Sequence, residues 1–123
     1  MATVTRTGSY VNMLGPGDTN ERMVQWTLLD GDDNGSWMPV EGVVESVHAL
    51  GTFDSGSVAL NGSNEQTPTT AGAALTHNGT NAIAITAEGV KKVWEQPAFI
   101  RPIVTGGGAS CSLTVLARMK MEA

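Results

Sequence analysis

The chain contains a single cysteine, few aromatic residues and few charged residues. These low counts limit the fold and the function that the chain can have. Cys111 has no second cysteine to pair with, so an internal disulfide is excluded and we expect synthesis in a reducing cytosol. Charged residues are 15% of the chain, a lower share than long amphipathic helices usually carry. No apolar run reaches the roughly 18 residues of a membrane helix, and residues 1–10 lack the apolar core of a secretory signal.

The excess of acidic over basic residues argues against partners that carry phosphate groups. Lys and Arg number 7 against 12 Asp and Glu, which gives a formal net charge of −5, and a protein that neutralises phosphates needs the opposite sign. We therefore expect neither a nucleic acid nor a membrane as partner. Cys111 alternates with Leu113 and Val115, which predicts a small core residue; a reactive thiol is the other interpretation.

What the chain has instead is a series of short alternating runs separated by turn residues. In Ser46–Asn64, two period-2 runs flank a turn of sequence DSG, which predicts a β-hairpin with one buried face. Phe99–Val104 and Cys111–Met119, joined by TGGGAS, predict a second hairpin. With further runs spaced about 8–12 residues apart, the pattern predicts one all-β domain, an antiparallel β-sandwich of jelly-roll type.

The remaining segments complete this predicted domain. Residues 1–22 are predicted to form an extended N-terminal arm or edge strand, and residues 23–123 the sandwich itself. The first strand of the sandwich, Met23–Leu29, is expected to bury Val24, Trp26 and Leu28 on one side. Pro102 lacks a backbone N–H, so we expect it at a sheet edge, at a bulge or facing solvent.

One formal metal motif occurs in the chain. Asp30, Asp32 and Asn34, with Glu41 further on, match the spacing of an EF-hand calcium loop, whose oxygens surround a hard cation. An EF-hand needs a helix on each side, whereas the flanking segments alternate like strands. We therefore interpret this stretch as a solvated acidic loop, and a calcium site of another type at the same four residues is the alternative.

The remaining polar residues form no recognisable catalytic set. His48 and His77 are the only histidines, and neither has the spacing of zinc ligands. The sequence has no G-x-S-x-G elbow, and no group of serine, histidine and aspartate can be nominated as a triad. We expect neither an enzyme nor a cofactor.

Three tryptophans, Trp26, Trp37 and Trp94, lie in or beside predicted strands. Core packing is the commoner use of such residues, and a platform for sugars or for another protein is the alternative. One alternative function is therefore a carbohydrate-binding module that uses Trp37 or Trp94.

Several segments, taken in order, resemble a known class of proteins. W-T-L-L is followed by an acidic glycine loop, then by S-V-H-A-L-G-T-F, S-V-A-L-N-G-S-N and T-A-E-G-V, and finally by F-I-R-P-I-V-T-G-G-G with S-L-T-V-L. This series, which runs from Trp26 to Ala117, is similar to small structural proteins of tailed bacteriophages encoded among the head genes. Many members carry N-D-G-x-x-W after G-S, whereas this chain has N-E-Q-T-P there, without the tryptophan.

The resemblance implies a capsid decoration, or cement, protein that is made in the bacterial host cytoplasm and lies on the outside of the virion. Its implied partners are the major capsid protein and further copies of itself, as a dimer or trimer. Residues of the N-terminal arm and of the outward strand faces then become candidate interface residues: Val4, Tyr10, Met13, Leu50, Leu116 and Arg118. A head–tail connector or tail protein is the remaining structural alternative.

Overall fold

The computed structural model describes residues 5–12, 21–68 and 71–120, and this part of the chain is built from strands without a helix. The strands are β1 (Thr5–Arg6), β2 (Ser9–Asn12), β3 (Glu21–Leu29), β4 (Asn34–Gly35), β5 (Met38–Pro39), β6 (Val43–Thr52), β7 (Ser57–Ser63), β8 (Ala73–Ala74), β9 (Gly89–Lys92), β10 (Phe99–Thr105) and β11 (Ser112–Lys120). No described segment is a helix that is both long enough and apolar enough to cross a membrane.

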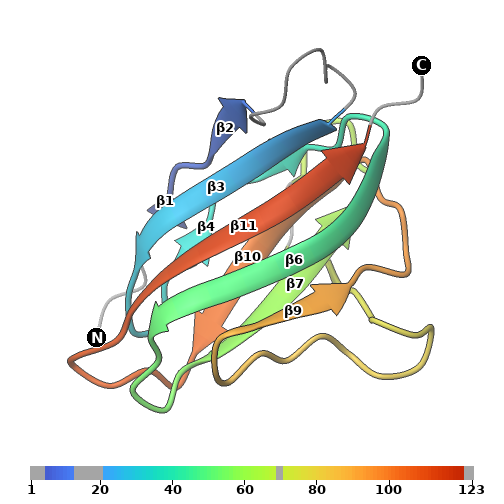
Figure 1. Ribbon diagram of the computed structural model, residues 1–123. Helices are drawn as coiled ribbons and strands as arrows, with labels where there is room; N and C mark the ends of the chain where they lie inside the picture. The colour runs from blue at the N-terminus through green and yellow to red at the C-terminus, as the bar shows by residue number, and fades with distance from the viewer. Residues whose placement is uncertain (1–4, 13–20, 69–70, 121–123) are drawn as a thin grey trace.

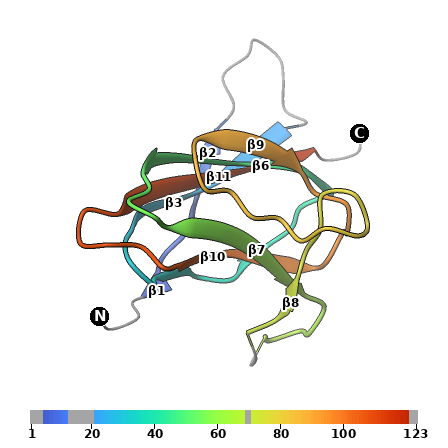
Figure 2. The same ribbon diagram turned by 90° about the horizontal axis from the view of Figure 1, so that it is seen from below.

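The strands form two sheets that pack face to face, and the two layers are plain when the molecule is viewed from below (Figure 1, Figure 2). One sheet has five strands in the order β2-β3-β11-β6-β9. The other has six, in the order β1-β4-β10-β7-β8, with β5 also paired to β10. Among the named strands, only the pairing of β1 with β4 is parallel. The predicted antiparallel sandwich is confirmed.

The order of the strands is that of a jelly roll. β4 and β5 occupy successive parts of one edge of β10, because Asn34 pairs with Ile103 and Met38 pairs with Ile100. Counted as one strand, they give the sheet orders β3-β11-β6-β9 and β4/β5-β10-β7-β8. From β3 onward the chain therefore crosses between the sheets at every connection but one, which is the interleaving that defines a jelly roll. β1 and β2 are added at the outer edges.

Both predicted hairpins are wrong in their pairing, although their strands exist. β6 pairs with β11 and β9, while β7 pairs with β10 and β8, so the turn at residues 53–56 carries the chain from one sheet to the other. The connection from β10 to β11 does the same. Alternation reports which side chains face the core. Two strands on opposite sheets that face a shared core alternate just as hairpin partners do, so the pattern cannot identify the partner.

The core lies between the sheets, and its largest side chain is the fully buried Trp26. The indole Nε1 donates a hydrogen bond to the carbonyl oxygen of Ser36 at 3.0 Å, so burial leaves no polar atom of the ring unpaired. Gly8 and Gly35 lie against the ring, and a Cβ at Gly8 would come within 2.6 Å of Nε1. The absence of a side chain at these positions lets the segment between β1 and β2 close over the tryptophan.

A bulge in β3 reverses one prediction. Between the pairs Trp26–Val115 and Leu29–Leu113, two residues of β3 stand opposite one residue of β11. Leu28, predicted on the buried side, is instead 63% exposed and has a φ of 59°, while Leu29 is fully buried. The extra residue shifts the alternation by one position, and that shift is not visible in the sequence pattern.

Pro102 lies in a central strand, which overturns its predicted placement at an edge or facing solvent. It is buried and pairs with Leu60 of β7. On the opposite side of β10, the neighbouring strand is broken between β4 and β5, and the proline ring packs against Gly35 there. A residue without an N–H is tolerated at this position because the neighbouring ladder is already interrupted.

Candidate functional site

The outer face of the five-stranded sheet carries accessible apolar side chains. Along β6 and β11, buried residues alternate with accessible ones, so one side of each strand faces the core and the other faces outward. Four apolar residues on the outward side form what we call the sheet-face strip: Leu28, Leu50, Val90 and Leu116. Leu28 and Val90 are 63% and 59% exposed, and the other two are partly exposed.

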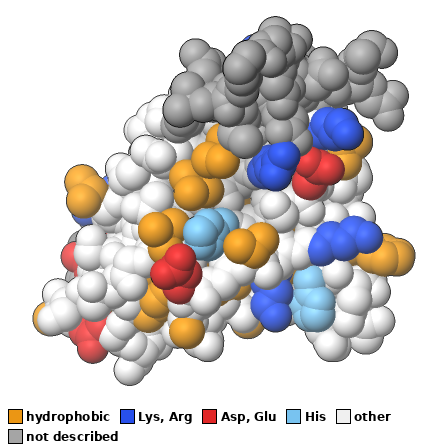
Figure 3. Space-filling view, in the orientation of Figure 1, with side chains coloured by type: hydrophobic (Ala, Val, Ile, Leu, Met, Phe, Trp, Pro, Cys, Tyr) orange, Lys and Arg blue, Asp and Glu red, His pale blue; other side chains and the backbone are white. Residues whose placement is uncertain are grey.

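The register places the residues of the strip beside one another. Leu116 of β11 and Val90 of β9 both pair with His48 of β6. Leu50 follows two positions along β6 and is therefore the diagonal neighbour of Leu116. Leu28 extends the strip onto β3, beside β11. Figure 3 shows this face of the molecule, with hydrophobic side chains gathered around a histidine near its middle.

Two polar pairs lie on this face, one at the middle of the strip and one beside it. The Nε2 atom of His48 lies 3.3 Å from Oε2 of Glu88, and Nε of Arg118 lies 3.8 Å from Oε1 of Glu45. All four side chains are partly exposed, so these pairs contribute little to folding stability. Accessible apolar side chains next to accessible polar ones are a common composition of protein–protein interfaces.

Three of the six predicted interface residues lie together on this face. Leu50, Leu116 and Arg118 all point outward, as their phase along the strands predicts. Val4 and Met13 lie outside the described residues. Their use as contacts stays a prediction.

Tyr10, the remaining predicted interface residue, is held by its own chain. Its hydroxyl donates to the carbonyl oxygen of Pro39 at 3.0 Å, and the guanidinium carbon of Arg22 lies 5.4 Å from the ring centroid. Burial, followed by the nearby Glu41 carboxylate, raises the pKa of this tyrosine, and Arg22 opposes the shift. Tyr10 belongs to β2, and β1 and β2 both pair with strands of the protein's own sheets. An arm that reaches a neighbouring subunit stays a prediction.

The structure does not bring the four residues of the calcium motif into one site. Glu41 forms an ion pair with Arg22 at 2.8 Å, at the end of the sandwich opposite the acidic loop. Asp32 accepts a hydrogen bond from the backbone N–H of Gly106, and Asn34 pairs with β10 as part of β4. Strands, not helices, flank the loop. Within residues 5–12, 21–68 and 71–120, no group of three or more His, Cys, Asp or Glu could hold a metal.

Cys111 is buried in the core beneath this acidic loop, which confirms the interpretation as a small core residue. Burial raises the pKa of its thiol, and the negative charges of Asp30, Asp54 and Asp33 add to the shift, against a hydrogen bond from the backbone of Gly31. A thiol held protonated in this way is a poor nucleophile. The cysteine therefore serves packing rather than chemistry.

The three tryptophans have different environments. Trp26 is fully buried, as described above. Trp37 is partly buried: the guanidinium carbon of Arg101 lies 4.8 Å from its ring centroid, and Gly72 packs against the edge of the ring. Trp94 is 56% exposed. Of the two tryptophans proposed as sugar platforms, Trp94 is therefore the more accessible.

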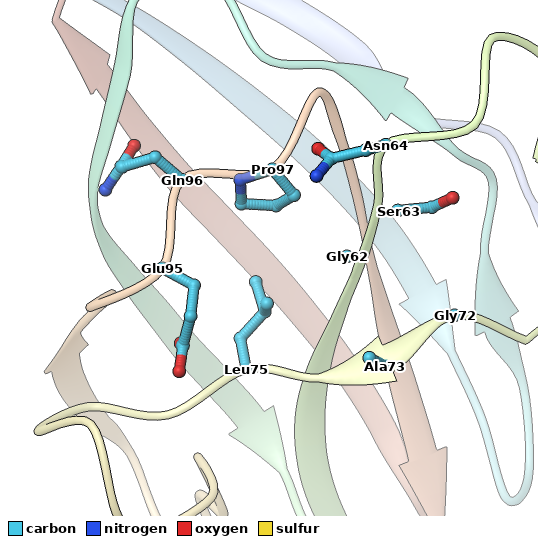
Figure 4. Close-up of a pocket in the computed structure, with 9 residues that line it drawn as sticks. All are labelled: Gly62, Ser63, Asn64, Gly72, Ala73, Leu75, Glu95, Gln96 and Pro97. Atoms are coloured by element: carbon cyan, nitrogen blue, oxygen red, sulfur yellow. The ribbon is translucent and has the colours of Figure 1, made fainter.

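A hollow of about 470 Å³ lies between β7, β8 and the segment before β10, and Figure 4 shows the residues that line it. Its polar side chains are already used within the protein. Glu95 accepts two hydrogen bonds from Thr76, at 2.7 Å each, and Asn64 accepts one from the backbone of Ala98. Ser63 and Gln96 are bonded to other parts of the chain. This hollow therefore offers a ligand few polar groups.

Sequence reasoning missed Leu28, Val90 and Val43 as accessible apolar residues, whereas it named Trp94 as one of two candidates. Leu28 is exposed by the bulge, and Val90 by its place on an edge strand, β9. Neither feature has a local signal in the sequence, because each depends on which strand lies alongside.

Comparison with protein-family models, with curated proteins and with solved structures finds no match for this chain.

Proposed function

We propose that the protein is a structural component of a tailed-phage virion, a decoration protein that docks on the outside of the capsid shell and stabilises it. The observation that supports this proposal most is the sheet-face strip, an accessible apolar surface on the outer face of the five-stranded sheet. The jelly-roll order adds support, because this fold recurs in viral capsid domains. The sequence resemblance supplies the shell as the partner.

Docking through the strip has a straightforward energetic basis. An apolar contact of about 300 Å² contributes roughly 7 kcal/mol at about 25 cal/mol per Å², before the cost of association. A protein that bridges two capsid subunits gains further, because its second contact is then intramolecular. Repeated over the shell, such contacts resist the pressure of the packaged genome. The negative net charge suits a position away from that genome.

The test is binding to phage particles assembled without this protein. Purified wild-type protein should occupy such particles, and the variants Leu116→Asp and Val90→Asp should bind at least about tenfold more weakly, because each buries a charge in the contact. Thr67→Asp, on an exposed loop away from the sheet face, is the matched control and should bind normally. Unchanged occupancy by both strip variants would contradict the proposal.

The number of copies in purified virions separates this function from the connector alternative. A decoration protein is present in many copies distributed over the shell, and quantitative mass spectrometry of virions measures that number directly. A count that corresponds to a single ring at one vertex would place the protein in the connector or tail and would exclude the proposed role.

A further inference from the structure

A second hollow, of about 520 Å³, opens where β6 begins and β9 ends. It is lined by Val43, Val44, Glu45, Lys92, Val93, Trp94 and Gln96. We infer that this hollow binds a carbohydrate, with the indole of Trp94 as the stacking surface and with Glu45 and Lys92 as hydrogen-bonding groups on its rim. This activity is separate from docking through the sheet-face strip.

Trp94 is held in place by the surrounding chain. Its backbone N–H donates to the carbonyl oxygen of Thr76 at 2.9 Å. The turn at Gly79 packs against the indole so closely that a Cβ there would lie 3.2 Å from Nε1, and Gly79 itself is bonded to the hydroxyl of Thr76. The ring is therefore both accessible and held in one position. Less conformational entropy of the Trp94 side chain is then lost when a ligand binds.

The side chains around the ring have complementary hydrogen-bonding character. Lys92 Nζ lies over the indole ring, 5.4 Å from its centroid, in a cation–π contact that a sugar stacking on this face would displace. The ammonium can donate only. The carboxylate of Glu45 can accept only. Its Oε1 lies 3.8 Å from Nε of Arg118, and the side chain is 41% exposed, so this weak surface pair leaves acceptor positions for a ligand. The indole Nε1–H of Trp94 is a further donor. Val43, 38% exposed, extends the apolar floor.

A pyranose sugar fits this combination because it has an apolar C–H face and a rim of hydroxyls that both donate and accept. The C–H face matches the indole, and the hydroxyls match one carboxylate acceptor and two N–H donors. The polar groups of the neighbouring hollow at Glu95 are used within the protein, as shown above. Gln96, the one lining residue shared by both hollows, is likewise bonded to Val44.

The test is an array of neutral and acidic pyranose oligosaccharides probed with the intact protein, followed by tryptophan-fluorescence titration with each sugar that binds. Trp94→Ala should weaken binding at least about tenfold. Trp94→Phe keeps an aromatic face and should recover part of the affinity. Glu45→Gln, which keeps the size of the side chain, should weaken binding by removing a charged acceptor. Equal unfolding midpoints for the variants and the wild type exclude loss of folding as the cause.

Val90→Ala provides the matched control, since Val90 lies on the sheet-face strip and does not line the hollow. It should leave sugar affinity unchanged while it lowers occupancy on phage particles, so the two activities fail independently. The inference is overturned if no oligosaccharide on the array binds, if Trp94→Ala binds sugar as the wild type does, or if Trp94→Ala abolishes only attachment to the particle.

Discussion

The carboxamide of Gln96 pairs with both backbone groups of Val44. The N–H of Val44 donates to Oε1 of Gln96 at 2.8 Å, and Nε2 of Gln96 donates to the carbonyl oxygen of Val44 at 2.9 Å. Val44 is fully buried, and the edge strand β9 ends at Lys92, whose partner on β6 is Ser46. The Gln96 side chain therefore continues the hydrogen-bond ladder along β6 beyond the end of β9. It pairs backbone groups that would otherwise be open at the edge of the sheet.

Replacing this glutamine should cost stability, because Gln96→Ala leaves a buried N–H and a buried carbonyl without partners. We expect a loss of about 1–3 kcal/mol in the free energy of unfolding, measured by urea denaturation. Gln66→Ala removes the same type of side chain from an exposed loop. It should change the free energy of unfolding by no more than about 0.5 kcal/mol. Equal stabilities for the two variants would show that the carboxamide of Gln96 is dispensable.

Gly8 should tolerate no side chain, because a Cβ there would meet Nε1 of Trp26 at 2.6 Å and Cγ of Met38 at 2.8 Å. We expect Gly8→Val to lower the free energy of unfolding by about 1–3 kcal/mol and to shift the tryptophan emission, as the indole is displaced. Gly89→Ala is the control, since its Cβ would meet nothing closer than 3.6 Å. A Gly8→Val variant as stable as Gly89→Ala would disprove the close packing of the N-terminal segment on Trp26.

Leu28 combines backbone strain with exposure, and the two effects can be separated by mutation. Its φ of 59° is unfavourable for leucine, by roughly 1 kcal/mol, whereas asparagine and glycine adopt this conformation readily. Leu28→Asn should therefore raise the unfolding free energy by a few tenths to about 1 kcal/mol. If the sheet-face strip docks on the shell, the same variant should bind phage particles less well. Leu50→Asn, in an extended strand, should lose binding without the gain in stability.

The buried thiol should make stability fall at high pH. Burial raises the pKa of Cys111 above its ordinary value of 9.0, so the folded state favours the protonated form more than the unfolded state does. The contribution of this group to stability is complete below pH 9.0 and is lost as the pH rises through the folded-state pKa. We expect the stability difference between the wild type and Cys111→Ala to shift in favour of the variant as the pH rises above 9.0.

Tyr10 also titrates at high pH with a raised pKa, but both proteins retain it, so its effect cancels in this comparison. A stability difference that does not change with pH would refute the shift. Iodoacetamide provides a second measurement: Cys111 should react slowly in the folded protein and rapidly in urea.

The local alternation in the sequence sufficed to identify part of the outward surface. Leu50, Leu116 and Arg118 were placed by their phase relative to the buried residues of the same strand, because successive side chains of a strand point to opposite faces. The same reasoning failed at Leu28, since a bulge is created by the partner strand and shifts the phase by one residue. Trp94 was one of two candidates until the structure showed Trp37 beneath Arg101.

By itself, the sequence determined that this is an all-β chain with one core, because alternating apolar residues and frequent turn residues leave no other regular structure that buries them. The tertiary structure alone decided which strands pair. The short connections after β6 and β10 cross from sheet to sheet, and the partners of a strand are chosen by packing across the whole core. The candidate sites follow from that choice, since the sheet-face strip and the hollow at Trp94 join residues from strands that are distant in the chain.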